Sequence, residues 1–276
     1  MKRKQTIVNV IIYAILIFTA ITMLVPFAWM ILTSFKTVGE STQVDPFIIF
    51  PSRWRMDNFV TVIKTMSFPK LYWNTLLMIF LRVLCAVLTS TFAGYAFARL
   101  EFPGKNLMFS LVLLQMMVPV QIFVIPQYVM VSKLGWINTI WGLLFPGLVS
   151  AFGTFLLRQA YMSLPKDLEE AARLDGCNIP QTFIFVMAPL ARSSMVALGI
   201  FTAVFAYKDL MWPIIVCPDT NSTTLASALA KMQGQFAVNY PQLMAAAFIA
   251  CLPMIILYVI FQKQFIEGIA TSGGKL

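Results

Sequence analysis

The stretch IVNVIIYAILIFTAITMLVPFAWMILT, residues 7–33, decides the fold class of this chain. It carries no charged side chain and exceeds the roughly 20 residues that a membrane-spanning helix needs. Lys2, Arg3 and Lys4 precede it, as in a secretory signal. The apolar core of such a signal is only about 7–15 residues long and is followed by a small-residue cleavage site, which is not seen here. We therefore expect a retained first transmembrane helix.

The composition supports a membrane protein. Of the 276 residues, 59% are hydrophobic and only 11% are charged, whereas a soluble domain is about one quarter charged. The net charge of +9 makes nucleic-acid binding a candidate function. However, Lys and Arg are scattered between apolar runs and form no basic face, so no nucleic-acid partner is expected. The chain has no histidine, and its four cysteines lack the spacing of a metal site. We expect no metal and no cofactor in this chain.

Five further apolar runs are long enough to span a membrane, and their continuity excludes the alternating strands of a barrel. The fold class is therefore an all-α membrane protein with six transmembrane helices in a single domain, residues 1–276. The five further helices are expected at about residues 71–98, 107–131, 139–157, 193–213 and 243–262.

Charge in the loops predicts the orientation. Of the 20 Lys and Arg residues, eleven fall on the side of the N-terminus and seven on the other side, while Arg82 and Lys208 lie within helices. Cytoplasmic loops of membrane proteins carry the excess of positive charge. We expect the chain to lie in the bacterial inner membrane with both termini in the cytoplasm.

The loop at residues 158–192 is long for a cytoplasmic loop and predicts a short helix of its own. Ser163 suits an N-cap, Pro165 suits the first turn, and Gly176 suits a C-cap with positive φ. The spacing alone fits two interpretations equally: an amphipathic helix lying on the surface, or a helix that docks a cytoplasmic partner.

The same loop resembles the signature of ABC-importer permeases. Glu170, Ala171 and Ala172 are followed after three residues by Gly176, and later by Pro189. Val186 and Ala188 stand where the family has Ile and Leu, and Tyr207-Lys208-Asp209 stands where it usually has Trp-Asn-Asp. Further segments resemble the carbohydrate-uptake, maltose-type branch over nearly the whole chain: Asn74-Thr75, residues 94–99 (GYAFAR), 102–105 (FPGK), 134–139 (LGWINT), 155–159 (FLLRQ), 265–268 (FIEG) and 273–275 (GGK).

The resemblance implies a type I ABC importer permease that works with other subunits. A second homologous permease would complete the pathway, and two ATPase subunits would bind ATP and Mg. A periplasmic or lipid-anchored solute-binding protein would deliver a sugar or related polyol. The chain itself has no Walker A loop, so no catalytic residue is assigned. The residues implied in ATPase coupling are Glu169, Glu170, Ala171, Ala172, Asp175 and Gly176.

Polar residues within the apolar runs are candidates for the substrate pathway, because such groups are costly in a membrane and often functional. Pro119 and Pro126 can open the third helix locally, and amide and hydroxyl groups cluster around them. Interhelical hydrogen bonds and kinks are the alternative role for these groups. The candidates are Asn74, Gln115, Gln121, Gln127, Tyr128 and Asp209.

Two other classes of function make different demands on the sequence. An ion-coupled secondary transporter should carry an acidic relay within the membrane and an internal repeat, but Asp209 is the single acid within the expected helices. A membrane enzyme should show a paired base and nucleophile, and none is evident; a membrane scaffold needs neither. A binding-protein-dependent importer is the function that the sequence favours.

Overall fold

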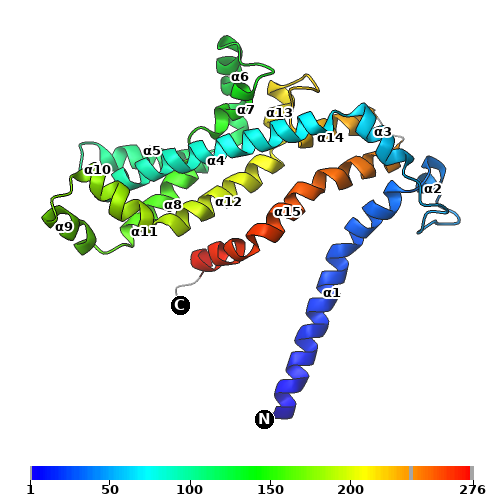
Figure 1. The fold of residues 1–276 in the computed structure, drawn as a ribbon, viewed down its shortest axis with the longest axis horizontal. Helices are drawn as coiled ribbons and strands as arrows, with labels where there is room; N and C mark the ends of the chain where they lie inside the picture. Colours follow the sequence, from blue (N-terminus) through cyan, green and yellow to red (C-terminus); the bar gives the residue numbers. More distant parts are fainter. Residues whose placement is uncertain (1, 236–238, 274–276) are drawn as a thin grey trace. The chain divides into compact units, whose positions relative to one another are not determined.

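The computed structural model describes residues 2–235 and 239–273, and every regular element in this part of the chain is helical (Figure 1). The expected all-α fold class is confirmed. Gly274 and Lys275 lie outside the described residues. Contacts divide the chain into two compact units, Met1–Phe68 with Leu229–Ile255 and Pro69–Ala228 with Ile256–Leu276, and each is described by itself.

The first unit contains the longest uninterrupted apolar helices. Helix α1 (Lys2–Ser34) includes the span Val8–Ser34, whose most apolar window has no buried residue, as suits a helix in lipid. It is followed by the short helices α2 (Val38–Thr42) and α3 (Asp57–Thr65), and the unit also takes the first part of α15 (Tyr240–Gly273). The helices expected at 7–33 and 243–262 lie within α1 and α15.

The segment after α1 is fixed by buried and partnered charges. The Lys36 ammonium is buried, lies 4.0 Å from the ring centre of Trp29 and donates to the carbonyl of Ile48 at 2.6 Å. The Glu40 carboxylate accepts from the backbone of Ser52 at 3.0 Å and forms a capping box at the start of α2. These hydrogen bonds, with those from Ser52 largest, lower the pKa of Glu40 to about 2. Burial lowers the pKa of Lys36.

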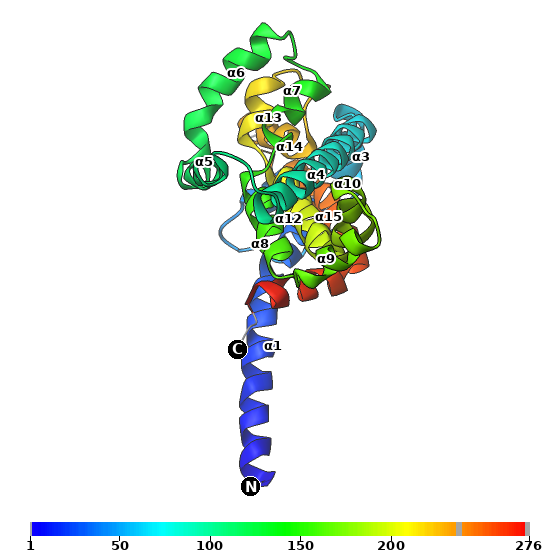
Figure 2. The same ribbon diagram turned by 90° about the vertical axis from the view of Figure 1, so that its left-hand side faces the viewer.

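The second unit contains α4 and the helices that follow it as far as α13. One long helix, α4 (Phe68–Arg99), lies beside α12 (Arg192–Lys208), and the two helices run in opposite directions (Figures 1 and 2). The others are α5 (Lys105–Met117), η1 (Val120–Phe123), α6 (Val124–Lys133), α7 (Ile140–Leu144), η2 (Phe145–Gly147), α8 (Ala151–Met162), α9 (Asp167–Leu174), α10 (Ile179–Thr182), the π-helix η3 (Phe183–Met187), α11 (Ala188–Leu190) and α13 (Met211–Val216). The start of α14 (Leu225–Gln235) belongs to this unit, and the rest of α14, from Leu229, belongs to the first.

Three of the six expected helices are interrupted, which differs from the continuous spans expected at 107–131, 139–157 and 193–213. The third breaks at Pro119, whose ψ of 130° is extended, and its two halves meet at 102°. The fourth bends by 46° between Ile140–Gly147 and α8. The fifth ends at Lys208, because Asp209 is extended. A further bend of 71° separates Ile179–Leu190 from α12, and within the described chain six spans result if each of the three bent pairs counts as one.

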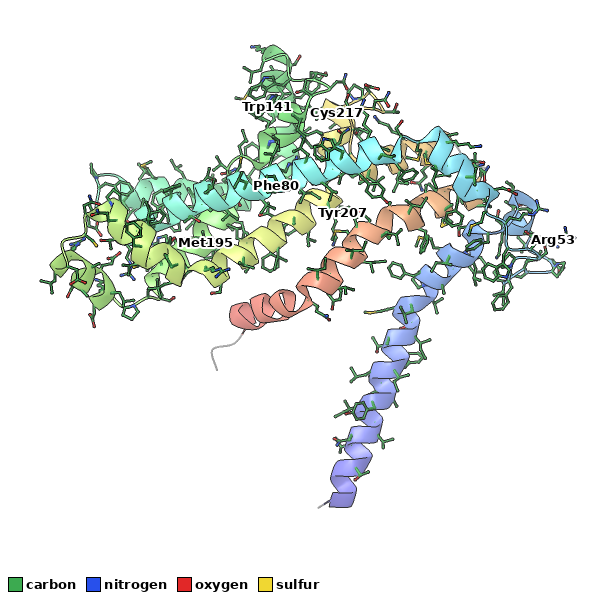
Figure 3. The ribbon with its side chains drawn as sticks, in the orientation of Figure 1. Arg53, Phe80, Trp141, Met195, Tyr207 and Cys217 are labelled. Carbon is green, nitrogen blue, oxygen red and sulfur yellow. The ribbon has the colours of Figure 1, made fainter. Side chains whose placement is uncertain are left out.

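Glycine allows α4, α8 and α12 to pack closely in the second unit. A Cβ on Gly94 of α4 would lie 2.9 Å from the backbone nitrogen of Arg158 on α8. Gly153 of α8 faces the Ser90 hydroxyl of α4 and the Leu198 side chain of α12 in the same way. Small residues permit such close approach where helices associate in a membrane. Outside this contact α4 keeps large apolar side chains exposed, including Phe80 at 62% (Figure 3).

Candidate functional site

The breaks in the fourth and fifth spans meet at one charged side chain of α4. Arg82 lies 14 residues after Phe68 and 17 before Arg99. At 1.5 Å per residue these separations are roughly 21 and 26 Å, so Arg82 lies near the middle of its span. Its side chain is only 8% exposed. An arginine buried at this depth needs partners for its donors.

The interrupted helices supply these partners. The Arg82 Nε donates to the carbonyl of Leu143 at 3.1 Å, and Nη2 donates to the same oxygen. Leu143 lies at the end of α7, where the break leaves its carbonyl without the usual helical donor. The Arg82 Nη1 donates to Asp209 Oδ2 at 2.8 Å, and Asp209 fills the gap between α12 and α13. Arg82 therefore supplies hydrogen-bond donors to the polar groups at both helix breaks.

Two close contacts hold this arrangement. A Cβ on Gly147 would lie 2.7 Å from the Cγ and Cδ atoms of Arg82, so only glycine lets the arginine stem pass at that point. The indole of Trp212 on α13 donates to the carbonyl of Gly142 on α7 at 2.9 Å. Both α7 and α13 are thereby fixed next to the ion pair.

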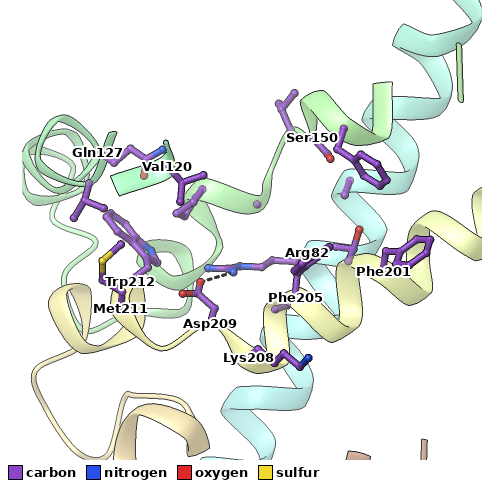
Figure 4. A pocket seen from close by; sticks show the side chains of 18 residues that line it. Arg82, Val120, Gln127, Ser150, Phe201, Phe205, Lys208, Asp209, Met211 and Trp212 are labelled. Carbon is purple, nitrogen blue, oxygen red and sulfur yellow. Dashed lines mark hydrogen bonds and ion pairs between the residues drawn. The ribbon is translucent and has the colours of Figure 1, made fainter. Parts of the chain in front are cut away.

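A cavity of about 770 Å³ opens beside the pair (Figure 4). Its walls include the rings of Phe201, Phe205 and Trp212 together with the side-chain amide of Gln127. Lys208 also lines the cavity, and its ammonium points away from the ion pair (Figure 4). Aromatic faces next to amide, hydroxyl and charged groups suit a ligand with both apolar faces and hydroxyl edges. The other lining residues are Arg82, Ala86, Val120, Val124, Pro146, Gly147, Val149, Ser150, Phe152, Thr202, Ala206, Asp209 and Met211.

The structure brings together only two of the six substrate-pathway candidates. Gln127 and Asp209 line the cavity, whereas Gln115, Gln121 and Tyr128 are exposed and do not line it. Asn74 does not line the cavity either: its amide donates to the carbonyls of residues 221 and 223 at 3.0 and 3.2 Å.

Sequence reasoning did not place Arg82 or Trp212 at the site. The signal for Arg82 was present, because it is a charge within an apolar run, but its partners lie 61 and 127 residues away. The expected helix at 193–213 would have held Lys208 and Asp209 in one continuous helix. That expectation is wrong, since α12 ends at Lys208.

The second candidate region is the helix predicted in the loop at 158–192. Helix α9 begins later than expected, at Asp167 after Lys166, and no side chain caps it. The expected N-cap, Ser163, instead donates to the carbonyl of Ala160 and ends α8. Ser163 was therefore wrongly assigned, because a serine that follows one helix and precedes another can bond to either.

The predicted end of α9 is confirmed. Gly176 has a φ of +85°, a conformation that glycine adopts without strain. Its amide donates to the carbonyl of Arg173 at 3.0 Å, and the amide of Cys177 donates to that of Ala172 at 2.9 Å. This pair of bonds is a Schellman motif, which turns the chain sharply away from the helix. A capping box between Asn178 and Gln181 then begins α10.

The two faces of α9 differ in exposure. Ala172 is buried at 5%, and Leu168 and Glu169 are half-buried against the rest of the chain. The opposite face leaves a large apolar side chain, Leu174, 90% exposed. The exposed side of α9 therefore combines small, charged and apolar side chains. Four of the six predicted coupling residues lie on this exposed side: Glu170, Ala171, Asp175 and Gly176.

One arginine ties the base of this region to α4. Arg99, the last residue of α4, donates from Nε and Nη2 to the carbonyl of Tyr161, at 3.1 and 2.6 Å. Its Nη2 also donates to the carbonyl of Leu164. The Glu169 carboxylate approaches Arg99 Nε to 4.0 Å. Next to these contacts the ring of Phe183 packs 4.9 Å from that of Tyr95.

These features define a polytopic, all-helical membrane protein with interrupted spans and an exposed loop helix. The chain belongs to the family of binding-protein-dependent transport system inner membrane components, whose model matches residues 86–270. The family is the membrane permease component of ABC importers, which works with a partner permease, an ATPase and a solute-binding protein; separate subunits hydrolyse ATP. The identification made from the loop signature is confirmed.

Individual relatives cover most or all of the chain. The arabinooligosaccharides transport system permease protein AraQ of Halalkalibacterium halodurans is 32% identical over 100% of both chains. The sn-glycerol-3-phosphate transport system permease protein UgpE of Pectobacterium atrosepticum is 30% identical over 76% of this chain and 75% of that one. A solved bacterial ABC transporter involved in import of the acidic polysaccharide alginate superposes with a TM-score of 0.79 at 21% identity, over 95% of this chain and 97% of that chain. This likeness supports the fold.

Proposed function

We propose that this chain is the permease subunit of an ATP-driven, binding-protein-dependent importer of sugars or related polyols. The names of its relatives support this substrate class, because they include arabinooligosaccharide, diacetylchitobiose and lactose systems. We also propose that residues 1–276 act as one transmembrane domain whose cytoplasmic coupling loop is 158–192.

The observation that carries the proposal is the exposed face of α9. Glu170, Ala171, Asp175 and Gly176 lie on that face, and a Schellman motif fixes its end. The small side chain of Ala171 lets another backbone approach closely, and exposed Leu174 offers an apolar contact. In the proposal this face inserts into a cleft of the ATPase, while Ala172 and Glu169 hold α9 to the permease.

The complete importer would contain a second homologous permease and two ATPase subunits, which bind ATP and Mg. A periplasmic or lipid-anchored solute-binding protein would deliver the substrate from outside, and lipid would surround the exposed apolar spans. The positive charge near the N-terminus supports an orientation with both termini in the cytoplasm. That orientation places α9, which follows the end of α8, on the ATPase side.

The cavity at Arg82 and Asp209 is the proposed stretch of the substrate pathway in this chain. Its aromatic walls suit the apolar faces of a sugar ring, and Gln127 suits a hydroxyl. The remaining pathway candidates, Asn74, Gln115, Gln121 and Tyr128, would act elsewhere along the route. Transport would follow alternating access: the ATPase binds one permease state more tightly than the other, and ATP binding and hydrolysis switch that preference.

The exchange Gly176→Asp tests the docking role of α9. It forces a side chain into positive φ and adds a charge at the end of the exposed face, so we expect uptake to fall about tenfold or more while membrane insertion is unchanged. Gly104→Asp is the matched control, because Gly104 also has positive φ (+79°) and, like Gly176, no atom within 4 Å of an added Cβ. Uptake and ATP hydrolysis are measured in proteoliposomes with the partner subunits. Normal uptake by the Gly176→Asp complex would contradict the proposal.

A further inference from the structure

Arg99 holds two segments of the coupling region at once. Its guanidinium donates to the carbonyls of Tyr161 and Leu164, which lie at and just beyond the end of α8. On its other side it faces the Glu169 carboxylate on α9. The Arg99 side chain is only 6% exposed, so these contacts replace nearly all of the hydrogen bonds that its guanidinium would make with water. Any movement of α9 relative to α8 must therefore either move Arg99 or break one of its contacts.

Glu169 is the incompletely satisfied member of this group. Its side chain is 12% exposed, and its Oε1 is buried without a hydrogen-bond partner in the described part of the chain. The distance of 4.0 Å to Arg99 Nε permits electrostatic attraction but is too long for a hydrogen bond. A buried carboxylate oxygen that lacks a hydrogen bond is costly. The attraction between Glu169 and Arg99 therefore favours a rearrangement that shortens the distance between the carboxylate and Nε.

We infer that Arg99 and Glu169 form a latch inside the permease that transmits the displacement of α9 to α4. This inference rests on the proposed function. Glu169 would act on Arg99 and not on the ATPase, in contrast to the exposed Glu170, and Arg99 would be a positioning residue. An interaction contributes to coupling when its strength differs between two states, and a loose ion pair at the base of the docking helix can change in this way.

The position of Arg99 gives the latch a route to the cavity. Arg99 is the last residue of α4, and Arg82 lies 17 residues earlier in the same uninterrupted helix. A helix transmits displacement along its axis as a rigid element, so a pull on Arg99 reaches the Arg82–Asp209 pair. Gly94 and Gly153 keep α8 in close contact with α4 along this route. The arrangement connects the exposed helix to the cavity through contacts within one chain.

The test uses the complete importer in proteoliposomes and measures solute imported per ATP hydrolysed. Glu169→Gln keeps the shape of the side chain and removes its charge, and we expect the import-to-ATP ratio to fall about tenfold. Arg99→Ala should have the same effect, and the double variant should be no worse than Arg99→Ala alone. Arg99→Lys, which keeps the charge without the planar fork, should restore part of the ratio. Glu101→Gln is the matched control, because Glu101 pairs with Lys105 on the exposed surface at 89% exposure.

The outcomes separate the latch from simpler roles. An import-to-ATP ratio that is unchanged by Glu169→Gln overturns the inference. It is also overturned if the fold-reductions of the two single variants multiply in the double variant, because the two residues would then act independently. If Arg99→Ala prevents assembly, Glu169→Gln and Arg99→Lys decide the question, because both preserve the packing. Absence of ATP-dependent import of any sugar by the unaltered complex would refute the proposed function itself. Import with a normal ratio in Glu169→Gln would refute only the latch.

Discussion

The exchange Arg82→Met should destabilise the permease strongly. Methionine replaces the stem of arginine but leaves the Leu143 carbonyl and the Asp209 carboxylate without their donor in a buried site. Removing one partner of a buried ion pair costs about 3–5 kcal/mol, and most of that cost comes from the charge left unpaired. Since 1.36 kcal/mol is a factor of ten, the folded-to-unfolded ratio should fall roughly 160- to 5,000-fold.

The role of the unpaired carboxylate can be separated by a double-mutant cycle. Asp209→Asn alone should cost about 3 kcal/mol, the lower end of that range, because the Arg82 charge loses its counter-charge while the asparagine oxygen can still accept from it. In the Arg82→Met background the same exchange should restore about 1–3 kcal/mol, because it removes the uncompensated charge. Lys208→Met is the control: this side chain lines the same cavity, yet its ammonium points away from the pair (Figure 4).

Equilibrium unfolding of the purified permease in mixed micelles with increasing SDS measures these differences. Trp212, one of six tryptophans, lines the same cavity as the pair, so loss of the site should change the intrinsic fluorescence; a variant that keeps Trp212 as its single tryptophan isolates that signal. The reasoning is refuted if Arg82→Met lies within about 1 kcal/mol of the unaltered protein. It is also refuted if Asp209→Asn destabilises the Arg82→Met variant further, because the carboxylate would then be stabilised by something other than the arginine.

Two further predictions concern packing and acid stability. Gly153→Leu should cost about 1–3 kcal/mol in the same unfolding assay, because the new side chain meets Ser90 directly; an unchanged midpoint would contradict the close packing of α8 on α4. The pKa of Glu40 is about 2, below its ordinary 4.5, so its contribution to stability is present above pH 4.5 and is lost as the pH falls from 4.5 to 2. Pepsin cleavage of the segment that Glu40 ties to Ser52 should therefore increase over that interval, and Glu40→Gln should be cleaved readily throughout; equal protection of both proteins would contradict the assignment.

The sequence predicted well those elements that depend on local composition. Continuous apolarity located α1 and α4 to within a few residues at the apolar ends, and the expected helices 7–33 and 71–98 lie inside Lys2–Ser34 and Phe68–Arg99. The end of α9 was also predictable, because a positive φ at Gly176 follows from glycine's conformational freedom alone. Such features need no knowledge of distant contacts.

The breaks and the ion pair were not predictable in the same way. Pro119 and Pro126 were recognised as residues that open a helix, yet proline alone does not determine a bend of 102°. The gap at Asp209 contains no proline, and it is stabilised by Arg82, which lies 127 residues away. A single sequence identifies a charged side chain that is costly to bury in a membrane. It does not identify the partner of that side chain, because the partner depends on how the helices pack.

The turn after α9 also gives the protein a natural site for chemical labelling. The chain's four cysteines form no disulfide, and Cys177, whose amide completes the Schellman motif, is half-buried and precedes the fifth span. Cys217 is buried, and Cys85 and Cys251 lie on the membrane helices α4 and α15. A water-soluble maleimide dye should therefore react first at Cys177, which would place a fluorophore at the edge of the exposed face of α9 without any engineered residue.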